Sequence, residues 1–106
     1  MEAMETLRER IKKLLIATST PLTIEEIANE LGVERERVKD IYSHLTHVAK
    51  TIRRESRGRL VLYMVPPICR NCGYVFKNLN KPRKPSKCPK CGSQRIEPPR
   101  FIIKEA

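Results

Sequence analysis

Two closely spaced pairs of cysteines constrain the fold of this chain more than any other feature. Cys69 and Cys72 form the first CxxC pair, Cys88 and Cys91 form the second 15 residues later, and a glycine follows each pair. A CxxC turn brings two thiolates close to one metal ion, and the glycine permits the positive φ that such a turn requires. Two pairs at this spacing predict a tetrahedral site with four sulfur ligands.

The alternative for four cysteines is a pair of disulfides, an arrangement typical of small secreted proteins. The sequence opens on an acidic, helix-prone stretch that lacks the features of a signal peptide, so we expect a reducing cytoplasm instead. Zinc (Zn²⁺) is the first choice of metal and iron the second, because a tetrahedron of four sulfurs accepts either ion. A site with four cysteine ligands leaves no open position for water, which favours a structural ion over a catalytic one.

Positive charge is concentrated in the half of the chain that holds the cysteines. Residues 1–55 carry 10 basic and 10 acidic side chains, whereas residues 56–106 carry 12 basic and only two acidic ones. The formal net charge of +10 therefore lies entirely in the second half. Four thiolates with one divalent ion would lower it to about +8. Such a surface attracts polyanions, which in the cytoplasm are chiefly nucleic acids; a solvated, lysine-rich surface is the simpler alternative.

The first half of the sequence predicts three amphipathic helices. Apolar residues recur every three or four positions over residues 4–17, 23–31 and 34–54, which is the period of a helix with one buried face. Thr23 starts the second helix with the spacing of a capping box, and Gly32 ends it. The short connection to the third helix is typical of a helix-turn-helix unit, although a plain three-helix bundle would show the same pattern.

In a helix-turn-helix unit the second helix enters the major groove of DNA. The outward positions of the segment 34–54 carry side chains that can meet phosphates or base edges, and a basic turn follows. Acidic residues at the start of the segment weaken the case for DNA, but they also suit the positive end of a helix dipole. The predicted DNA contacts are Arg35, Lys39, Ser43, His47, Lys50, Arg54, Arg57 and Arg59.

Two apolar stretches, residues 60–65 and 100–104, predict strands that pair as a two-stranded wing. Pro-Pro pairs at 66–67 and 98–99 stop both strands and bracket an insert that contains all four cysteines. The insert is too short to bury a sufficient core of its own, so the metal must supply the missing stability. The predicted units are a helical domain with the wing, residues 1–67 and 98–106, and a ribbon, residues 68–97.

The segment Leu22–Val33 is similar to the first helix and turn of many prokaryotic winged-helix regulators. The knuckles Cys69–Tyr74 and Cys88–Gly92 resemble those of rubredoxin and other zinc ribbons. Together they resemble archaeal predicted transcriptional regulators that join a winged helix-turn-helix to a rubredoxin-like zinc ribbon. The resemblance implies DNA binding and an α+β fold of three helices and a wing, with a small four-cysteine zinc ribbon inserted in or following the wing. In two respects the chain departs from these families: the ribbon takes the place of the usual short wing, and it is basic where rubredoxins are acidic.

We therefore expect a cytoplasmic protein that is not an enzyme, binds double-stranded DNA and regulates transcription. No glycine-rich phosphate loop, recognisable catalytic nucleophile or membrane-length apolar run occurs in the sequence. One alternative is a protein-interaction module of a larger nucleic-acid machine, with other transcription proteins as partners; it predicts weak DNA affinity and a co-purifying partner. Another is a rubredoxin-like redox protein, which predicts a red iron form that is reduced reversibly by one electron. The sequence leaves the oligomeric state open.

Overall fold

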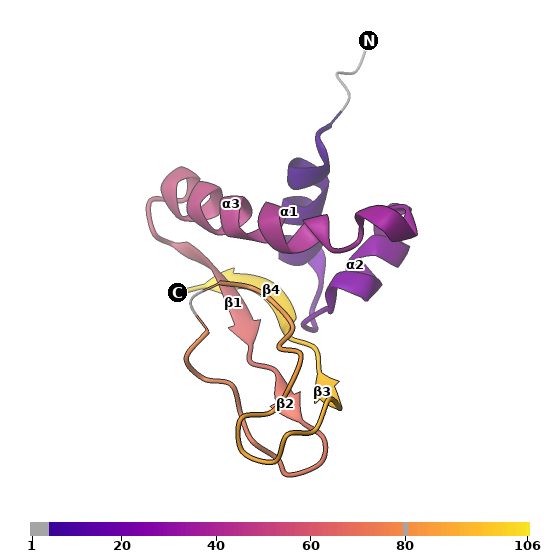
Figure 1. Ribbon diagram of the computed structural model, residues 1–106. Helices are drawn as coiled ribbons and strands as arrows, with labels where there is room; N and C mark the ends of the chain where they lie inside the picture. The colour runs from indigo at the N-terminus through magenta and orange to yellow at the C-terminus, as the bar shows by residue number, and fades with distance from the viewer. Residues whose placement is uncertain (1–4, 80) are drawn as a thin grey trace.

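The computed structural model describes residues 5–79 and 81–106 as a mixed α+β fold. The helices are α1 (Leu7–Ala17), α2 (Ile24–Leu31), a short 3₁₀ helix η1 (Arg35–Arg37) and α3 (Asp40–Glu55). The strands are β1 (Leu60–Val65), β2 (Ile68–Cys69), β3 (Ile96–Glu97) and β4 (Arg100–Glu105). The α-helices lie at one end of the molecule, and the ribbon, residues 68–97, extends from the other end of the β1–β4 sheet (Figure 1). Within the described residues, no helix combines the length and the apolar character that a membrane span requires.

An N-cap determines where α1 begins. The predicted start at Met4 lies outside the described residues, and the observed helix follows directly after Thr6. The Thr6 hydroxyl accepts a hydrogen bond of 3.2 Å from the Glu9 N–H, which satisfies one of the unpaired donors at a helix start. Ile11 and Leu15 of the predicted apolar stripe are buried in the core.

The predicted capping box at the start of α2 is confirmed. The Glu26 N–H donates to the Thr23 hydroxyl at 3.1 Å, and the Thr23 N–H donates to the Glu26 carboxylate at 2.9 Å. Gly32 then ends the helix with a φ of 69°, in the left-handed region that glycine adopts without strain. Both ends of this eight-residue helix are therefore set by local sequence signals.

The third helical segment is not the single α-helix predicted over 34–54. A 3₁₀ turn occupies its start, and the α-helix begins only at Asp40. Hydrogen bonds between residues three apart continue through the junction, such as the 3.1 Å bond from the Ile41 N–H to the Val38 carbonyl. In this tighter winding, residues i and i+3 lie on the same side, so Val38 and Ile41 both pack into the core.

The predicted pairing of the two long strands is confirmed. β1 and β4 run antiparallel in a register of six residue pairs, with Leu60 opposite Glu105 at one end. β4 also meets the chain just before α2, where Leu22 and Phe101 exchange backbone hydrogen bonds of 2.9 and 2.7 Å. β2 and β3 form a separate two-stranded ladder within the ribbon. The two Pro-Pro pairs lie between these ladders, as their positions in the sequence predict.

The molecule has two separate hydrophobic cores. The larger one lies between the helices and the β1–β4 sheet, where Phe101 is fully buried and meets the Tyr42 ring edge-on at a centroid distance of 6.3 Å. The smaller one lies in the ribbon, and its buried residues are Cys69, Phe76, Cys88 and Ile96. Because two of these four residues are cysteines, the ribbon contains little apolar material of its own.

Polar contacts connect α1 to α3. Lys12 Nζ lies 2.9 Å from a Glu55 carboxylate oxygen, and Arg8 Nε donates a 3.1 Å hydrogen bond to His44 Nδ1. Partial burial of His44, together with the nearby Arg8 charge, lowers the pKa of this histidine below its ordinary value. His47, the other histidine, is exposed to solvent.

We expect His44, through its partial burial and the nearby Arg8 charge, to make folding stability depend on pH. Because the pKa of His44 in the folded chain lies below 6.5, the unfolded chain takes up the proton more readily. The free energy of unfolding should therefore be unaffected well above pH 6.5 and decrease below it, until the folded-state histidine is protonated as well. His44→Gln keeps an acceptor for Arg8 and should show a smaller decrease. Denaturant unfolding at two pH values measures the difference, and equal decreases in both proteins would contradict the expectation.

Candidate metal centre

The two CxxC pairs form matching turns. In each turn the glycine N–H donates to the carbonyl of the first cysteine, at 2.9 Å from Gly73 to Cys69 and at 2.8 Å from Gly92 to Cys88. Both glycines have a positive φ, 80° and 76°, which a residue with a side chain would adopt only with strain. The positive φ predicted for these glycines is confirmed. It lets each CxxC turn direct its two thiols toward the thiols of the other turn.

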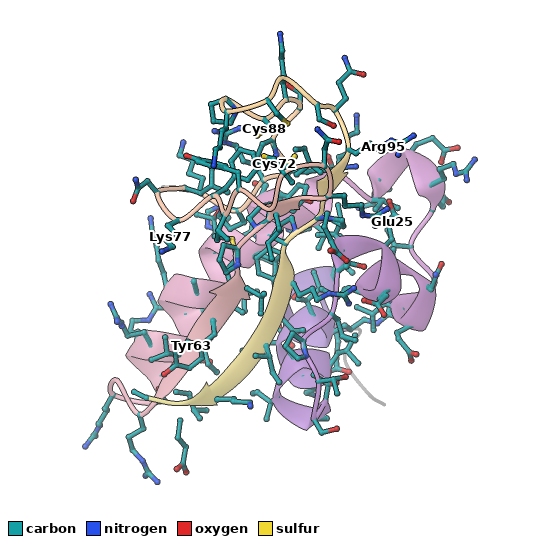
Figure 2. All side chains as sticks on the ribbon, turned by 90° about the horizontal axis from the view of Figure 1, so that it is seen from below. Glu25, Tyr63, Cys72, Lys77, Cys88 and Arg95 are labelled. Carbon is teal, nitrogen blue, oxygen red and sulfur yellow. The ribbon has the colours of Figure 1, made fainter. Side chains whose placement is uncertain are left out.

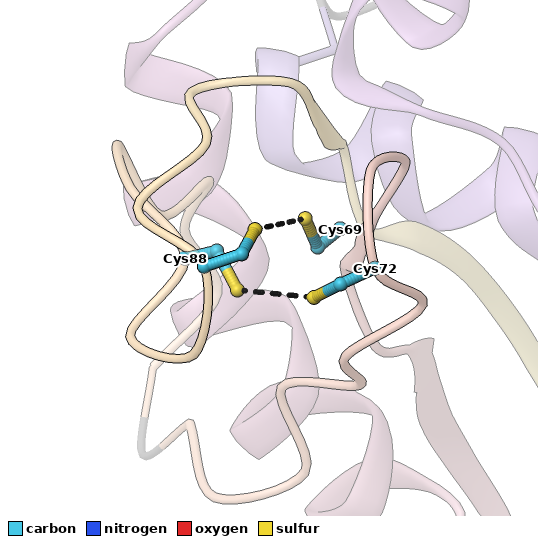
Figure 3. Close-up of side chains that lie close together, drawn as sticks. Cys69, Cys72 and Cys88 are labelled. Carbon is cyan, nitrogen blue, oxygen red and sulfur yellow. Dashed lines mark hydrogen bonds between the residues drawn. The ribbon is translucent and has the colours of Figure 1, made fainter.

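The four sulfur atoms lie within 4.8 Å of one another. The Sγ atoms of Cys69 and Cys91 are 3.6 Å apart, and so are those of Cys72 and Cys88, so both close contacts join one knuckle to the other (Figure 3). A disulfide would need about 2.0 Å, and all four cysteines are free. A tetrahedron with metal–sulfur bonds of about 2.3 Å has edges of about 3.8 Å, close to these separations. The donor set therefore suits one metal ion.

The four cysteines differ in their exposure to solvent. Cys69 and Cys88 are 0% and 1% exposed and belong to the ribbon core, whereas Cys72 and Cys91 lie at the surface. Cys69 lies in β2, whose pairing with β3 fixes the first knuckle to the base of the ribbon. An ion bound by all four sulfurs would therefore join the buried side of the ribbon to its surface.

The thiols differ in how readily they lose a proton, because their hydrogen bonds and surroundings differ. The Asn71 side-chain amide, on the first knuckle, donates to the Cys91 sulfur on the second at 3.5 Å. This bond, together with one from the Ser93 backbone, lowers the pKa of the Cys91 thiol to about 6. A backbone hydrogen bond at Tyr74 favours the Cys72 thiolate, but burial and the neighbouring thiols outweigh it and raise the pKa of Cys72 to about 12. Four thiols this close cannot all lose their protons unless a cation compensates the charge, and a divalent ion would do so.

Comparison with known proteins places the chain in a family. The model of the PF0610-like N-terminal domain matches residues 6–61, and that of the PF0610 rubredoxin-like zinc beta-ribbon domain matches residues 66–106. The chain belongs to the PF0610-like family. It is similar to the solution NMR structure of protein PF0610 from Pyrococcus furiosus, with 33% sequence identity, a TM-score of 0.76, and coverage of 100% of this chain and 98% of that chain. No protein of curated function matches.

Membership of the PF0610-like family confirms the rubredoxin-like zinc ribbon that the cysteine knuckles resemble. The likeness to winged helix-turn-helix regulators stays a prediction, as does the division into residues 1–67 with 98–106 and residues 68–97. The ribbon-domain match extends to residue 106 and so includes β4, which pairs with β1 in the sheet.

The eight residues predicted to contact DNA are all exposed in this PF0610-like protein, but they do not form one row. Four of them follow the face of α3 opposite its buried residues: Ser43, His47, Lys50 and Arg54. Two more, Arg57 and Arg59, lie in the tight turn between α3 and β1. Arg35 and Lys39 are separate from both sets, because they line a hollow between the helices and the ribbon.

The contact of Asn71 with the metal centre is not evident from the sequence, where this residue is one of the two positions between the cysteines of a CxxC pair. Its amide acts on Cys91, 20 residues away, so local spacing gives no sign of the contact. The only signal in the sequence is the residue type, a short side chain that can donate a hydrogen bond to sulfur.

Removal of the metal should unfold the ribbon and leave the helical core intact. The helices and the β1–β4 sheet share a core of their own, whereas two of the four residues in the ribbon core are cysteines. Structural zinc contributes on the order of 10 kcal/mol in comparable small modules. After chelation, NMR spectra should lose dispersion for ribbon amides and keep it for α1 and α3. Cys69→Ser lacks one ligand and, even with metal supplied, should show the same loss of dispersion in the ribbon. Unchanged spectra after chelation, or unfolding of the whole chain, would contradict the expectation.

Asn71→Ala should weaken metal binding. Loss of a hydrogen bond to a metal ligand typically lowers the affinity by about 10- to 100-fold. Acid should also release the metal at a higher pH, because the Asn71 bond that lowers the pKa of Cys91 is gone and protons compete better for the thiolate. Competition with a chromophoric chelator measures both effects. Asn78→Ala, at an exposed position of the same ribbon, is the matched control, and equal affinities in the two variants would refute a role for Asn71.

Proposed function

We propose that this protein binds double-stranded DNA and regulates transcription, with α2 and η1–α3 as a helix-turn-helix unit and β1 and β4 as the strands of a wing. The arrangement of the elements supports the proposal. The segment at Leu22 pairs with β4 before α2 begins, and β1 follows α3 to complete the sheet under the helices. In this arrangement the ribbon replaces the tip of the wing.

The exposed face of α3 is the observation that carries the proposal. The buried residues of this helix all lie on one side: Ile41, Leu45, Val48 and Ile52. The opposite face exposes Ser43, His47, Lys50 and Arg54, which recur at helical spacing. With its side chains a helix is about 10–12 Å wide, and the major groove of DNA is about 12 Å wide. These side chains can donate to phosphates or base edges when the helix lies in that groove.

Cations on either side of α3 would hold the flanking phosphates. Arg57 and Arg59 follow the helix, and residues 68–97 carry eight basic side chains against one acidic side chain. The acidic residues that weaken the case for DNA lie at or before the start of the helix, where Asp40 occupies the first turn and suits the positive end of the helix dipole. We therefore expect DNA to approach the middle and the C-terminal half of α3.

We further propose that the ion is zinc and that its role is structural, so that the protein is not an enzyme. Four sulfur ligands complete a tetrahedron and leave no position for a reacting water. Metal analysis of protein produced without added zinc tests this assignment. Stoichiometric zinc is expected, whereas a red iron form with reversible one-electron reduction would support the rubredoxin-like redox alternative instead.

Fluorescence anisotropy with random duplex DNA tests the DNA proposal. We expect binding at low salt that weakens steeply as salt is added. Lys50→Ala should weaken it several-fold and reduce the slope of log K against log salt by about 0.9, because one phosphate contact is lost. Lys13→Ala removes the same charge from an exposed position of α1 and should leave binding nearly unchanged. Absence of binding at low salt, or equal effects of the two variants, would refute the proposal.

A protein-interaction role is the second candidate function. It is favoured by Tyr63 and Val65 of β1, whose side chains are 42% and 39% exposed. The two residues alternate with core residues along the strand, so they share the outer face of the sheet. This role predicts weak duplex affinity and a co-purifying partner that Tyr63→Ser releases.

A further inference from the structure

The helices and the ribbon enclose a groove that the proposed duplex contact on α3 does not use. One hollow of about 1070 Å³ lies between the start of α2, the η1–α3 junction and residues 83–86 of the ribbon. A second hollow of about 520 Å³ lies between the start of α2 and the base of the ribbon. Both are lined by Glu25, Lys84 and Gln94, so they form one continuous depression, which we call the ribbon groove.

The ribbon groove concentrates positive charge. Its basic lining residues are Arg35, Lys39, Arg70, Arg83, Lys84 and Arg95. None of them forms an ion pair within residues 5–79 and 81–106. Glu25 is the one carboxylate among the lining residues. Like charges on the two walls repel each other, and a polyanion lying between them would relieve this repulsion.

The floor of the ribbon groove is suited to nucleobases. On the helical side it is apolar, with Ile24, Val38 and the half-buried ring of Tyr42. The exposed amides of Asn29 and Gln94 stand at its walls and can both donate to and accept from base edges. An aromatic ring beside cations and amides offers the contacts that unpaired bases make in sites for single strands. An acidic peptide would meet the cations, but its carboxylate side chains offer no planar base to stack on the ring.

We infer that the ribbon groove binds a single strand of nucleic acid, a few nucleotides long, with its phosphates on the basic walls and its bases toward Tyr42. A base-paired duplex is too thick to enter a depression of this volume. The inference does not rest on duplex binding by α3, because the exposed row on that helix and the groove lining have no residue in common. Only the flanking cations of the ribbon are shared between the two proposals.

The test uses the zinc-loaded full chain and a fluorescent oligothymidylate of about eight nucleotides. Arg83→Ala/Lys84→Ala should weaken binding about tenfold and reduce the salt slope by about 1.4, since two phosphate contacts to a single strand are lost. Lys77→Ala/Lys90→Ala removes the same charge from ribbon positions outside the groove and should change binding less than about twofold. In Figure 2, Lys77 projects on the side of the ribbon away from Glu25 and Arg95.

A second pair of variants tests the groove by removing a negative charge instead of positive ones. Glu25→Gln removes the carboxylate from the groove and should strengthen single-strand binding several-fold, because phosphates no longer meet a negative group. Glu30→Gln, at an exposed position of the same helix outside the groove, should have no effect.

Three results would overturn the inference: no oligothymidylate binding at low salt, equal effects of the two double variants, or equally effective displacement by polyglutamate of the same charge. The Lys50→Ala variant separates this inference from the duplex proposal, since it should weaken duplex binding and leave single-strand binding unchanged. Single-strand binding that falls with Lys50→Ala as much as with Arg83→Ala/Lys84→Ala would also overturn it.

Discussion

Convergence of four sulfur atoms on one point takes the place of a hydrophobic core in the ribbon. The core of the ribbon consists of Phe76, Ile96 and the two inner cysteines, which is far too little apolar surface to order some thirty residues in water. A cation that binds all four thiolates links the two knuckles and compensates their charge. Everything else that the ribbon presents, its basic surface and one wall of the ribbon groove, depends on that linkage.

The β1–β4 ladder fixes the position of the ribbon relative to the helices. Six residue pairs hold the two strands together, and β4 is fixed in turn to the segment before α2 through Leu22 and Phe101. At the points where the chain leaves the sheet for the ribbon, Pro67 and Pro99 are fully buried. A buried proline has a fixed φ and no donor to satisfy, so both exits are stiff. The ribbon is therefore held in a defined place beside α2 and η1.

Local signals in the sequence predicted the helices, strands and turns well. The features that the sequence did not predict depend mainly on contacts between distant segments. The capping box at Thr23, the glycine turns of the knuckles and the Pro-Pro breaks each act within a few residues, and the structure has them all. The tight winding before Asp40 escaped prediction, because 3₁₀ and α turns can bury the same apolar residues. The Asn71–Cys91 bond and the ribbon groove join segments 20 to 70 residues apart, so neither leaves a pattern in the sequence.

The separation of neutral helices from a basic ribbon makes the molecule electrically lopsided. The body is 53 Å long, the first 55 residues carry no net charge, and the part of the ribbon around β2 and β3 lies away from α1 and α3 (Figure 1). In the electric field of a polyanion, this permanent dipole moment produces a torque that turns the ribbon toward the polyanion before the two surfaces touch. At physiological ionic strength the torque acts only over distances of about 8 Å, and added salt shortens them. In dilute buffer the protein would thus meet a polyanion with its ribbon already facing it. In concentrated salt it would meet the polyanion in a random orientation.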